Sequence, residues 1–273
     1  MVTVRVPATT ANLGPGFDTL GLALALYNTL TFEELAEGLY FEGVDPEYAT
    51  AENLAVVAYK AVLSKLGLPM PGLRISVQAE IPICRGLGSS AALIAAGAAG
   101  ANANHGSPLT RAELLAVCND IEGHPDNLAP AIFGGLVASF VENERPYIAR
   151  YSLHKRLRCT ALIPDFQLST HLARGVLPKE VPYGDAIFNV SRTAVLLRAL
   201  EEGDTETISV SLRDKLHQPF RRTLIPGFDE AEALANSCGC VAFFISGAGP
   251  TLLCLSADPD FDARLAARLS ELP

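Results

Sequence analysis

A run of small residues between a proline and a long apolar segment constrains this chain most strongly. Residues 82–97 read PICRGLGSSAALIAAG, with glycines at positions 86, 88 and 97. The loose alternation in QAEIPI predicts a strand that ends in Ile-Pro-Ile. The alanine-rich stretch after the glycines predicts a helix, which Ser89 or Ser90 can cap. The sequence therefore predicts a strand, a glycine turn and a helix N-terminus in direct succession.

The N–H groups at such a helix start have no intrahelical partners, and together with the helix dipole they attract an anion such as phosphate. The stretch lacks the lysine of the GxxxxGK[ST] motif, so it is not a Walker A loop. It also lacks the spacing and the later acidic residue of a dinucleotide-binding GxGxxG motif. A simpler alternative is that the small residues only let a helix pack closely against its neighbour.

The net charge of −9 over 273 residues argues against general binding to nucleic acid or to anionic membranes. An acidic chain must bind a polyanion through a local field of amides, arginines and a metal ion. No apolar run reaches the length of a membrane span, and the first residues, MVTVRVPATT, lack the apolar region of a signal peptide. We therefore expect a cytoplasmic protein.

The chain contains six cysteines, of which Cys238 and Cys240 are the only close pair. A CxC pair without a second pair or nearby histidines is more typical of two buried small side chains than of a zinc site. We expect the cysteines to be reduced and structural.

The apolar periodicity predicts strands and helices in mixed order, without the regular period of a doubly wound fold. The expected strands include VTVRVPA, GLRISVQAEIPI and a hairpin in VAFFISGAGPTLLCLSA. The expected helices include TAENLAVVAYKAVLSKLGL, RAELLAVCNDIE after Ser107 or Thr110, DAIFNVSRTAVLLRALEEG and DEAEALANSCG. A change in composition over residues 142–160 predicts a boundary between two domains of the α+β class.

Three segments, read together, resemble the motifs of the GHMP small-molecule kinases, a family named for galactokinase, homoserine kinase, mevalonate kinase and phosphomevalonate kinase. They are PATTANLGPGFDTLG (7–21), PICRGLGSSAA (82–92) and SGAGPTL (246–252). The first of these is similar to the branch that phosphorylates homoserine. So are EGHPDNLAPAIFGG (122–135), STHLARGVLPKEV (169–181) and HQPFRRTLIPGF (217–228). The six segments follow one another over nearly the whole chain.

The resemblance implies a two-domain α+β fold, with an S5-like N-terminal domain over residues 1–150 and a ferredoxin-like C-terminal domain over residues 151–273. The N-terminal domain would carry the ATP-binding glycine loop. The implied reaction transfers the γ-phosphoryl group of ATP to the hydroxyl of L-homoserine, giving O-phospho-L-homoserine in threonine biosynthesis, and it requires Mg²⁺. The family also implies a homodimer.

By the same resemblance, the glycine turn wraps the ATP phosphates, and Asn53 contacts adenine unless it serves only as a helix cap. The implied ATP-binding residues of the turn are Pro82, Ile83, Cys84, Arg85, Gly86, Leu87, Gly88, Ser89, Ser90, Ala91 and Ala92. Ser90 and Glu122 are the implied magnesium ligands, since Mg²⁺ prefers hard oxygen donors and usually keeps several waters. The alternative for Glu122 is a surface carboxylate at a helix end.

Homoserine carries an ammonium, a carboxylate and a hydroxyl group. The resemblance assigns the ammonium to Asp18 and the carboxylate to Arg174 and Arg221, because an arginine offers two parallel donors to a carboxylate. Arg222 is the neighbouring alternative to Arg221, and a solvated surface charge is the alternative role for each arginine. Asn12 is implied to hold the substrate.

His124, Asn127 and Glu122 are the implied catalytic residues. His124 would lie near the transferred phosphoryl group or the hydroxyl, and Asn127 would donate its amide to a γ-phosphate oxygen. Phosphoryl transfer depends mainly on alignment and charge stabilisation, so a strong base is optional. Asp126 is the alternative base, which we rank below a mechanism without a base. The segment SGAGPTL is implied to stabilise the glycine loop, and it also reads as a hairpin turn.

One residue departs from the family pattern, because position 84 is cysteine where the family more often has glycine. If that position requires a positive φ, the cysteine strains the loop by roughly 1–2 kcal/mol. We expect the enzyme to tolerate it.

Three other functions compete with the implied one. They are a kinase for another small alcohol, a ligand sensor without activity, and an RNA-binding module with an S5-like fold. The ammonium and carboxylate partners argue against the first, the residues Ser90, Glu122 and His124 against the second, and the acidic charge against the third.

Overall fold

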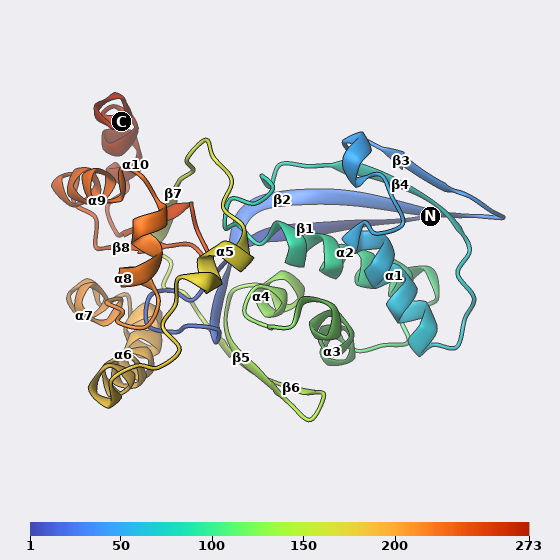
Figure 1. Ribbon diagram of the computed structural model, residues 1–273, viewed down its shortest axis with the longest axis horizontal. Helices are drawn as coiled ribbons and strands as arrows, with labels where there is room; N and C mark the ends of the chain where they lie inside the picture. Colours follow the sequence, from blue (N-terminus) through green and yellow to red (C-terminus); the bar gives the residue numbers. More distant parts are fainter. Residues whose placement is uncertain (273) are drawn as a thin grey trace. The chain divides into compact units, whose positions relative to one another are not determined.

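The computed structural model describes residues 1–272, and its internal contacts divide the chain into two compact units (Figure 1). The first unit comprises Met1–Thr9, Gly21–Ile83 and Gly88–Ala149. The second unit comprises Thr10–Leu20, Cys84–Leu87 and the chain from Arg150 onward. Two short segments from the N-terminal half therefore belong to the unit that the C-terminal half builds.

The first unit is built on a six-stranded sheet in the order β3-β4-β2-β5-β6, with β1 paired to β2. Strand β4 runs antiparallel to β2, with Phe32 opposite Ile75, and parallel to β3. The strands are β1 (Val2–Ala11), β2 (Leu20–Leu35), β3 (Leu39–Glu42), β4 (Gly72–Gln78), β5 (Leu136–Glu142) and β6 (Arg145–Tyr151).

Four helices complete the first unit: α1 (Leu54–Lys65), α2 (Ser89–Asn104), α3 (Arg111–Glu122) and α4 (Leu128–Phe133). Helix α2 contacts the other three. A Cβ on Gly97 would lie 2.1 Å from the Ala55 carbonyl oxygen, and one on Gly100 would lie 2.5 Å from the Phe32 ring. The small residues of α2 therefore permit close packing, in addition to any role at its N-terminus.

The second unit contains a three-stranded antiparallel sheet in the order β7-β9-β8. Its strands are β7 (Arg158–Leu162), β8 (Ala242–Ile245) and β9 (Leu252–Ser256). Its helices are α5 (Thr170–Gly175), α6 (Tyr183–Glu202), α7 (Thr205–Ser211), α8 (Gln218–Arg221), α9 (Phe228–Ser237) and α10 (Phe261–Ala266). Three 3-10 helices complete the described chain: η1 (Pro46–Tyr48), η2 (Arg222–Leu224) and η3 (Leu269–Glu271).

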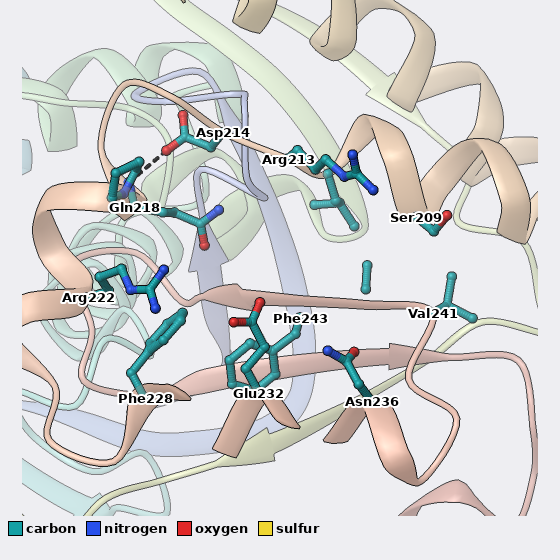
Figure 2. A pocket seen from close by; sticks show the side chains of 13 residues that line it. Ser209, Arg213, Asp214, Gln218, Arg222, Phe228, Glu232, Asn236, Val241 and Phe243 are labelled. Atoms are coloured by element: carbon teal, nitrogen blue, oxygen red, sulfur yellow. Dashed lines mark hydrogen bonds between the residues drawn. The ribbon is translucent and has the colours of Figure 1, made fainter. Parts of the chain in front are cut away.

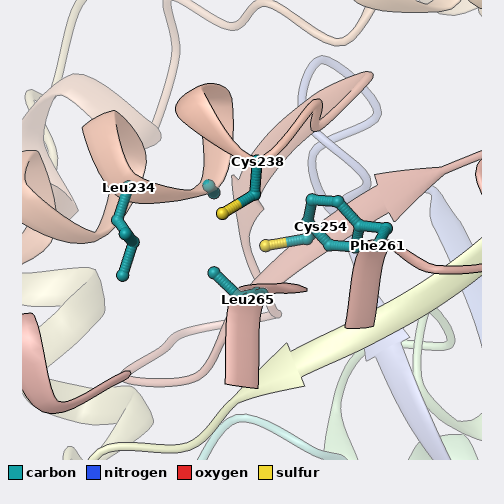
Figure 3. Close-up of a cluster of buried hydrophobic side chains, with 6 residues drawn as sticks. Leu234, Cys238, Cys254, Phe261 and Leu265 are labelled. Atoms are coloured by element: carbon teal, nitrogen blue, oxygen red, sulfur yellow. The ribbon is translucent and has the colours of Figure 1, made fainter. Parts of the chain in front are cut away.

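Part of the core of the second unit contains cysteines. Cys238 and Cys254 are buried among Leu234, Phe261 and Leu265 (Figure 3). Cys240 is half-buried, and its thiol donates to the Ala242 carbonyl. All six cysteines are thiols, and burial raises the pKa of Cys118 and of Cys159 to about 12. Cys238 is thus a small core side chain, as the sequence predicts.

The α+β class and most expected elements are confirmed. Asn53 caps α1 by accepting from the Ala55 N–H, and Thr110 forms a capping box with Glu113 at the start of α3. No helix within residues 1–272 combines the length and apolarity needed to cross a membrane. Five elements, β3, β6, α5, α7 and α8, were not predicted, and each is at most seven residues long.

Two expectations around the glycine turn are wrong. The strand ends at Gln78 and does not continue to Ile83, because the Asn28 side chain accepts from the N–H groups of Glu80 and Ile81 and takes them out of the ladder. Neither Ser89 nor Ser90 caps α2. Its N-cap is Gly88, in the left-handed conformation, and no side-chain cap is present.

Candidate active site

The glycine turn leads into the N-terminus of α2, where backbone N–H groups can bind an anion. Three residues of the turn have positive φ values, 54° at Cys84, 77° at Gly86 and 67° at Gly88. Because no side chain caps α2, the N–H groups of its first turn remain available to a ligand. The condition for strain at position 84 is therefore met, since a cysteine occupies a conformation that favours glycine.

The segment SGAGPTL supports this turn, as the resemblance implies. Ser246 donates from Oγ to the Gly86 carbonyl over 2.6 Å, and the Thr251 N–H donates to the Arg85 carbonyl. A Cβ on Gly86 would lie 2.5 Å from the Ser246 carbonyl oxygen, so the two backbones approach closely. Within the second unit, the turn thus rests on the β8–β9 connection.

Ser90 and Glu122 come together in the first unit. The Ser90 hydroxyl, in the first turn of α2, donates over 2.6 Å to a carboxylate oxygen of Glu122, the last residue of α3. Within residues 1–272 no three His, Cys, Asp or Glu side chains are grouped to hold a metal ion. Mg²⁺ needs fewer protein ligands than that when waters and phosphate oxygens complete its shell, and two hard oxygens suit it.

The segment HPDN, between α3 and α4, forms a network around one buried carboxylate. Asp126 is 3% exposed, and its Oδ1 accepts from Nδ1 of His124 at 2.8 Å and from the Asn127 N–H at 2.9 Å. Thr9 donates from Oγ1 to Oδ1 of Asn127 at 2.8 Å, which leaves the NH₂ end of this amide as the donor. A Cβ on Gly88 would lie 2.0 Å from Oγ1 of Thr9, so this network adjoins the start of α2.

The loop from Asn12 to Asp18 belongs to the second unit and is strained. Asn12, Leu13 and Asp18 all have positive φ values. Asn12 is 2% exposed and holds the loop by donating from Nδ2 to the Gly247 carbonyl and accepting from the Asp18 N–H. Non-glycine residues in this conformation persist only where their surroundings hold them, and they concentrate at functional sites.

Asp18, Arg174 and Arg221 are brought together around Phe17. Arg174 donates to the two carboxylate oxygens of Asp18 over 2.8 and 3.0 Å, and this pair is partly exposed. Arg221 is 2% exposed and donates to the carbonyls of Ala173 and Gly247. Both guanidinium groups lie over the Phe17 ring, 5.8 Å away for Arg174 and 5.1 Å for Arg221. We call Phe17, Asp18, Arg174 and Arg221 the arginine cluster.

Arg221 belongs to this cluster, and its neighbour Arg222 does not. Arg222 is exposed and pairs with Asp229 instead. Asn53 uses both ends of its amide locally, since its Nδ2 also donates to the Tyr48 carbonyl. An adenine contact from Asn53 therefore stays a prediction.

Sequence reasoning missed three residues of these networks. Thr9 and Phe17 lie inside the quoted segment PATTANLGPGFDTLG, which was the available signal. His217 begins HQPFRR and is buried, with Nε2 donating to the Gly14 carbonyl and its ring stacked on Phe17. Burial, and secondarily the nearby Arg221 charge, lower the pKa of His217 below its ordinary value, although Asp214 opposes this shift. A neutral ring suits a position beside a buried guanidinium.

Comparisons with known proteins place these networks in context. Residues 53–135 match the model of the GHMP kinases N terminal domain, and residues 196–272 match that of the GHMP kinases C terminal domain. A homoserine kinase of Clostridium botulinum is 44% identical over 274 residues, covering 100% of this chain and 92% of the relative. A homoserine kinase of Moorella thermoacetica is 46% identical over 272 residues, covering 98% and 92%.

A solved structure is also similar along the chain. The crystal structure of homoserine kinase from Cytophaga hutchinsonii superposes with a TM-score of 0.87 at 28% identity, covering 98% of this chain and 90% of that one.

Proposed function

This chain belongs to the GHMP kinase family, and from that membership we propose that it is a homoserine kinase. The enzyme transfers the γ-phosphoryl group of ATP to the side-chain hydroxyl of L-homoserine, giving O-phospho-L-homoserine for threonine biosynthesis. Relatives more than 40% identical along the whole chain support this substrate.

The arginine cluster is the observation that carries the substrate assignment. A carboxylate beside two guanidinium groups can pair with both charged groups of an amino acid, whereas a sugar or mevalonate has no ammonium to bind. We assign the ammonium to Asp18 and the carboxylate to Arg174 and Arg221. The Arg174–Asp18 pair is partly exposed, so opening it for a substrate costs little. Asn12 holds Asp18 in place through the Asp18 N–H.

For ATP, we assign the phosphates to the N–H groups of the glycine turn between Gly86 and Ala91. Ser90 and Glu122 fit Mg²⁺, because their two oxygens lie 2.6 Å apart and can both turn toward one cation. Bound there, the cation would neutralise charge on the β- and γ-phosphate oxygens. Asn127 would direct its NH₂ group to a γ-phosphate oxygen, since Thr9 already donates to its carbonyl end.

His124 and Asp126 act as a pair in this proposal. The Asp126 carboxylate accepts from His124 and from the Asn127 backbone, so it orients two side chains that we place at the reacting groups. No strong base is then needed, because the transition state of phosphoryl transfer is loose and depends on alignment.

We expect Asp126→Asn to lower kcat by less than about tenfold. The asparagine carbonyl can still accept from His124 and Asn127, and a general base normally contributes about 10²- to 10⁴-fold. A pH–rate profile of the variant that keeps the shape of the native profile would support orientation as the role. A loss of 10³-fold, together with loss of the acidic limb of the profile, would instead make Asp126 the base.

Cys84→Gly tests whether the strained cysteine handicaps the enzyme. Glycine relieves a left-handed strain of about 1–2 kcal/mol but raises the entropy of the unfolded chain by an opposing amount. We therefore expect the KM for ATP and the melting temperature to change little. A rise in ATP affinity of tenfold or more would show that the cysteine is costly. Cys84→Ala is the matched control, because it removes the thiol and keeps the strain.

A coupled ADP-release assay with ATP and Mg²⁺ tests the whole assignment. L-homoserine should turn over, while L-serine, L-threonine and mevalonate should turn over at least 100-fold less efficiently. Turnover of mevalonate instead would move the chain to another branch of the family. Binding of ATP without turnover of any alcohol would replace the enzyme by a nucleotide-dependent sensor.

The remaining assignments follow the family. We propose an N-terminal GHMP domain over residues 1–150 and a C-terminal one over residues 151–273, of which Pro273 lies outside the described residues. We also propose a cytoplasmic homodimer that binds no nucleic acid and no membrane. Tyr183, Ile187 and Val190 form an exposed apolar stripe on α6, which could serve a second copy. Light scattering on the native chain and on Val190→Asp would test the dimer.

A further inference from the structure

A cavity lies within the second unit, and none of the residues of the arginine cluster lines it. It has a volume of about 440 Å³ and is bounded by α7, α8, α9, β8 and the turn after α7 (Figure 2). Apolar side chains such as Phe228, Val241 and Phe243 form part of its lining. A cavity of this size suits a small molecule with a short apolar stem.

Two opposite charges in this lining have no ion-pair partner within residues 1–272. They are Arg213, on the turn after α7, and Glu232, on α9. The other charged groups of the lining are already engaged. Arg222 pairs with Asp229, and Asp214 accepts from the backbone N–H groups of Leu216, His217 and Gln218, which lead into α8. The cavity therefore offers one guanidinium and one carboxylate to a ligand.

Two amides lie beside these charges. Gln218 accepts through Oε1 from the Ile245 N–H, so its NH₂ end is left as a donor. Asn236 follows Glu232 by one helical turn and shares its face of α9. Figure 2 shows Arg213, Gln218, Glu232 and Asn236 around one space.

We propose that this cavity is a second binding site for a small zwitterion of the α-amino-acid type. Its carboxylate binds Arg213 and the Gln218 amide, and its ammonium binds Glu232 and the Asn236 carbonyl. The side chain of the ligand rests on Phe228 and Phe243. A simple anion or a simple cation would engage only one of the two protein charges, and so binds more weakly than a zwitterion that engages both.

The site is placed to regulate homoserine binding, an extension that rests on the proposed function. Helix α8 carries Gln218 to the cavity and Arg221 to the arginine cluster. Asp214, beside Arg213, anchors the start of this helix through backbone N–H groups. A ligand that shifts α8 changes the KM for homoserine, and by reciprocity homoserine changes the affinity of the ligand.

The test uses the full-length enzyme without L-homoserine, because homoserine is itself an α-amino acid and would compete for the cavity. Binding at the arginine cluster is recognised because Arg221→Ala weakens it, whereas binding at the cavity survives that substitution. The protein amino acids are screened by thermal shift, and each hit is titrated by calorimetry together with its deaminated acid and its decarboxylated amine. We expect at least one amino acid to bind, its single-charge analogues to bind at least tenfold more weakly, and Arg213→Ala and Glu232→Gln each to weaken it at least tenfold. Arg198→Ala and Glu230→Gln are matched controls outside the cavity.

The outcomes separate this site from the proposed function. If no amino acid binds at millimolar concentration, or if binding survives both cavity variants, the second site is wrong whatever the kinase assay shows. If the cavity binds its amino acid but L-homoserine is not phosphorylated, the site stands and the proposed function fails. A KM for homoserine that stays constant while the cavity fills would overturn the regulatory part alone.

Discussion

Glu122→Gln is expected to lower kcat by about 100-fold or more, because it removes the charged ligand that we assign to Mg²⁺. Glutamine can still accept the hydrogen bond from Ser90, so the contact between α2 and α3 is kept and the fold should survive. Loss of about 3 kcal/mol of charge stabilisation corresponds to this factor, at 1.36 kcal/mol for each tenfold change in rate. Initial rates over a range of Mg²⁺ concentrations measure it.

The Mg²⁺ dependence distinguishes a metal ligand from a structural carboxylate. The apparent affinity for Mg²⁺ should fall together with kcat, and excess Mg²⁺ should restore part of the rate. Asp120→Asn changes another carboxylate of α3 and should leave both values unaltered. If Glu122→Gln keeps its kcat within threefold at every Mg²⁺ concentration, Glu122 is only a carboxylate at the end of α3.

Arg221→Lys is expected to raise the KM for L-homoserine by about 100-fold with a smaller change in kcat. A lysine has its three donors on a single nitrogen, so it cannot replace Nε at the Ala173 carbonyl and Nη1 at the Gly247 carbonyl and still offer two parallel donors to a substrate carboxylate. A guanidinium has five donors in a planar fork. Each lost hydrogen bond to a charged group costs about 1.5–3 kcal/mol. Steady-state kinetics with L-homoserine as the varied substrate provide the measurement.

Arg222→Lys is the matched control, and it also decides between the two neighbouring arginines. Its side chain is exposed and paired with Asp229, so its KM should stay within twofold of the native value. The KM for ATP should be unchanged in both variants, which shows that any effect is not general unfolding. Equal effects of the two substitutions would remove the special role of Arg221.

The glycine turn illustrates what the sequence could reveal and what it could not. Small residues and helix formers in PICRGLGSSAALIAAG were enough to predict a helix start with available N–H groups, which the structure contains. The strand end and the cap could not be placed, because both depend on distant contacts. Asn28 ends the strand by binding two N–H groups more than fifty residues later, and Glu122 engages the hydroxyl of Ser90.

In the arginine cluster, too, the sequence pointed to some residues and could not reveal others. Asp18, Arg174 and Arg221 were proposed from separate segments by resemblance, and the structure brings them together around Phe17. Phe17 and His217 carry no chemistry that marks them in a sequence, because a ring that stacks or a histidine that binds a carbonyl looks like any core residue. Their roles appear only when residues some 200 positions apart meet.

The order of synthesis has a consequence for the segment from Thr10 to Leu20, which belongs to the second unit although the ribosome makes it well before the rest of that unit. The hydrogen bond from Asn12 to the Gly247 carbonyl cannot form until Gly247 has been synthesised, and the one from His217 to the Gly14 carbonyl cannot form until His217 has been synthesised. The first unit has all its residues once Ala149 has emerged, but the native contacts of Thr10–Leu20 need residues as late as Gly247. A chain that ends before His217 and Gly247 therefore cannot form the native hydrogen bonds of this segment, even though it contains every residue of the first unit.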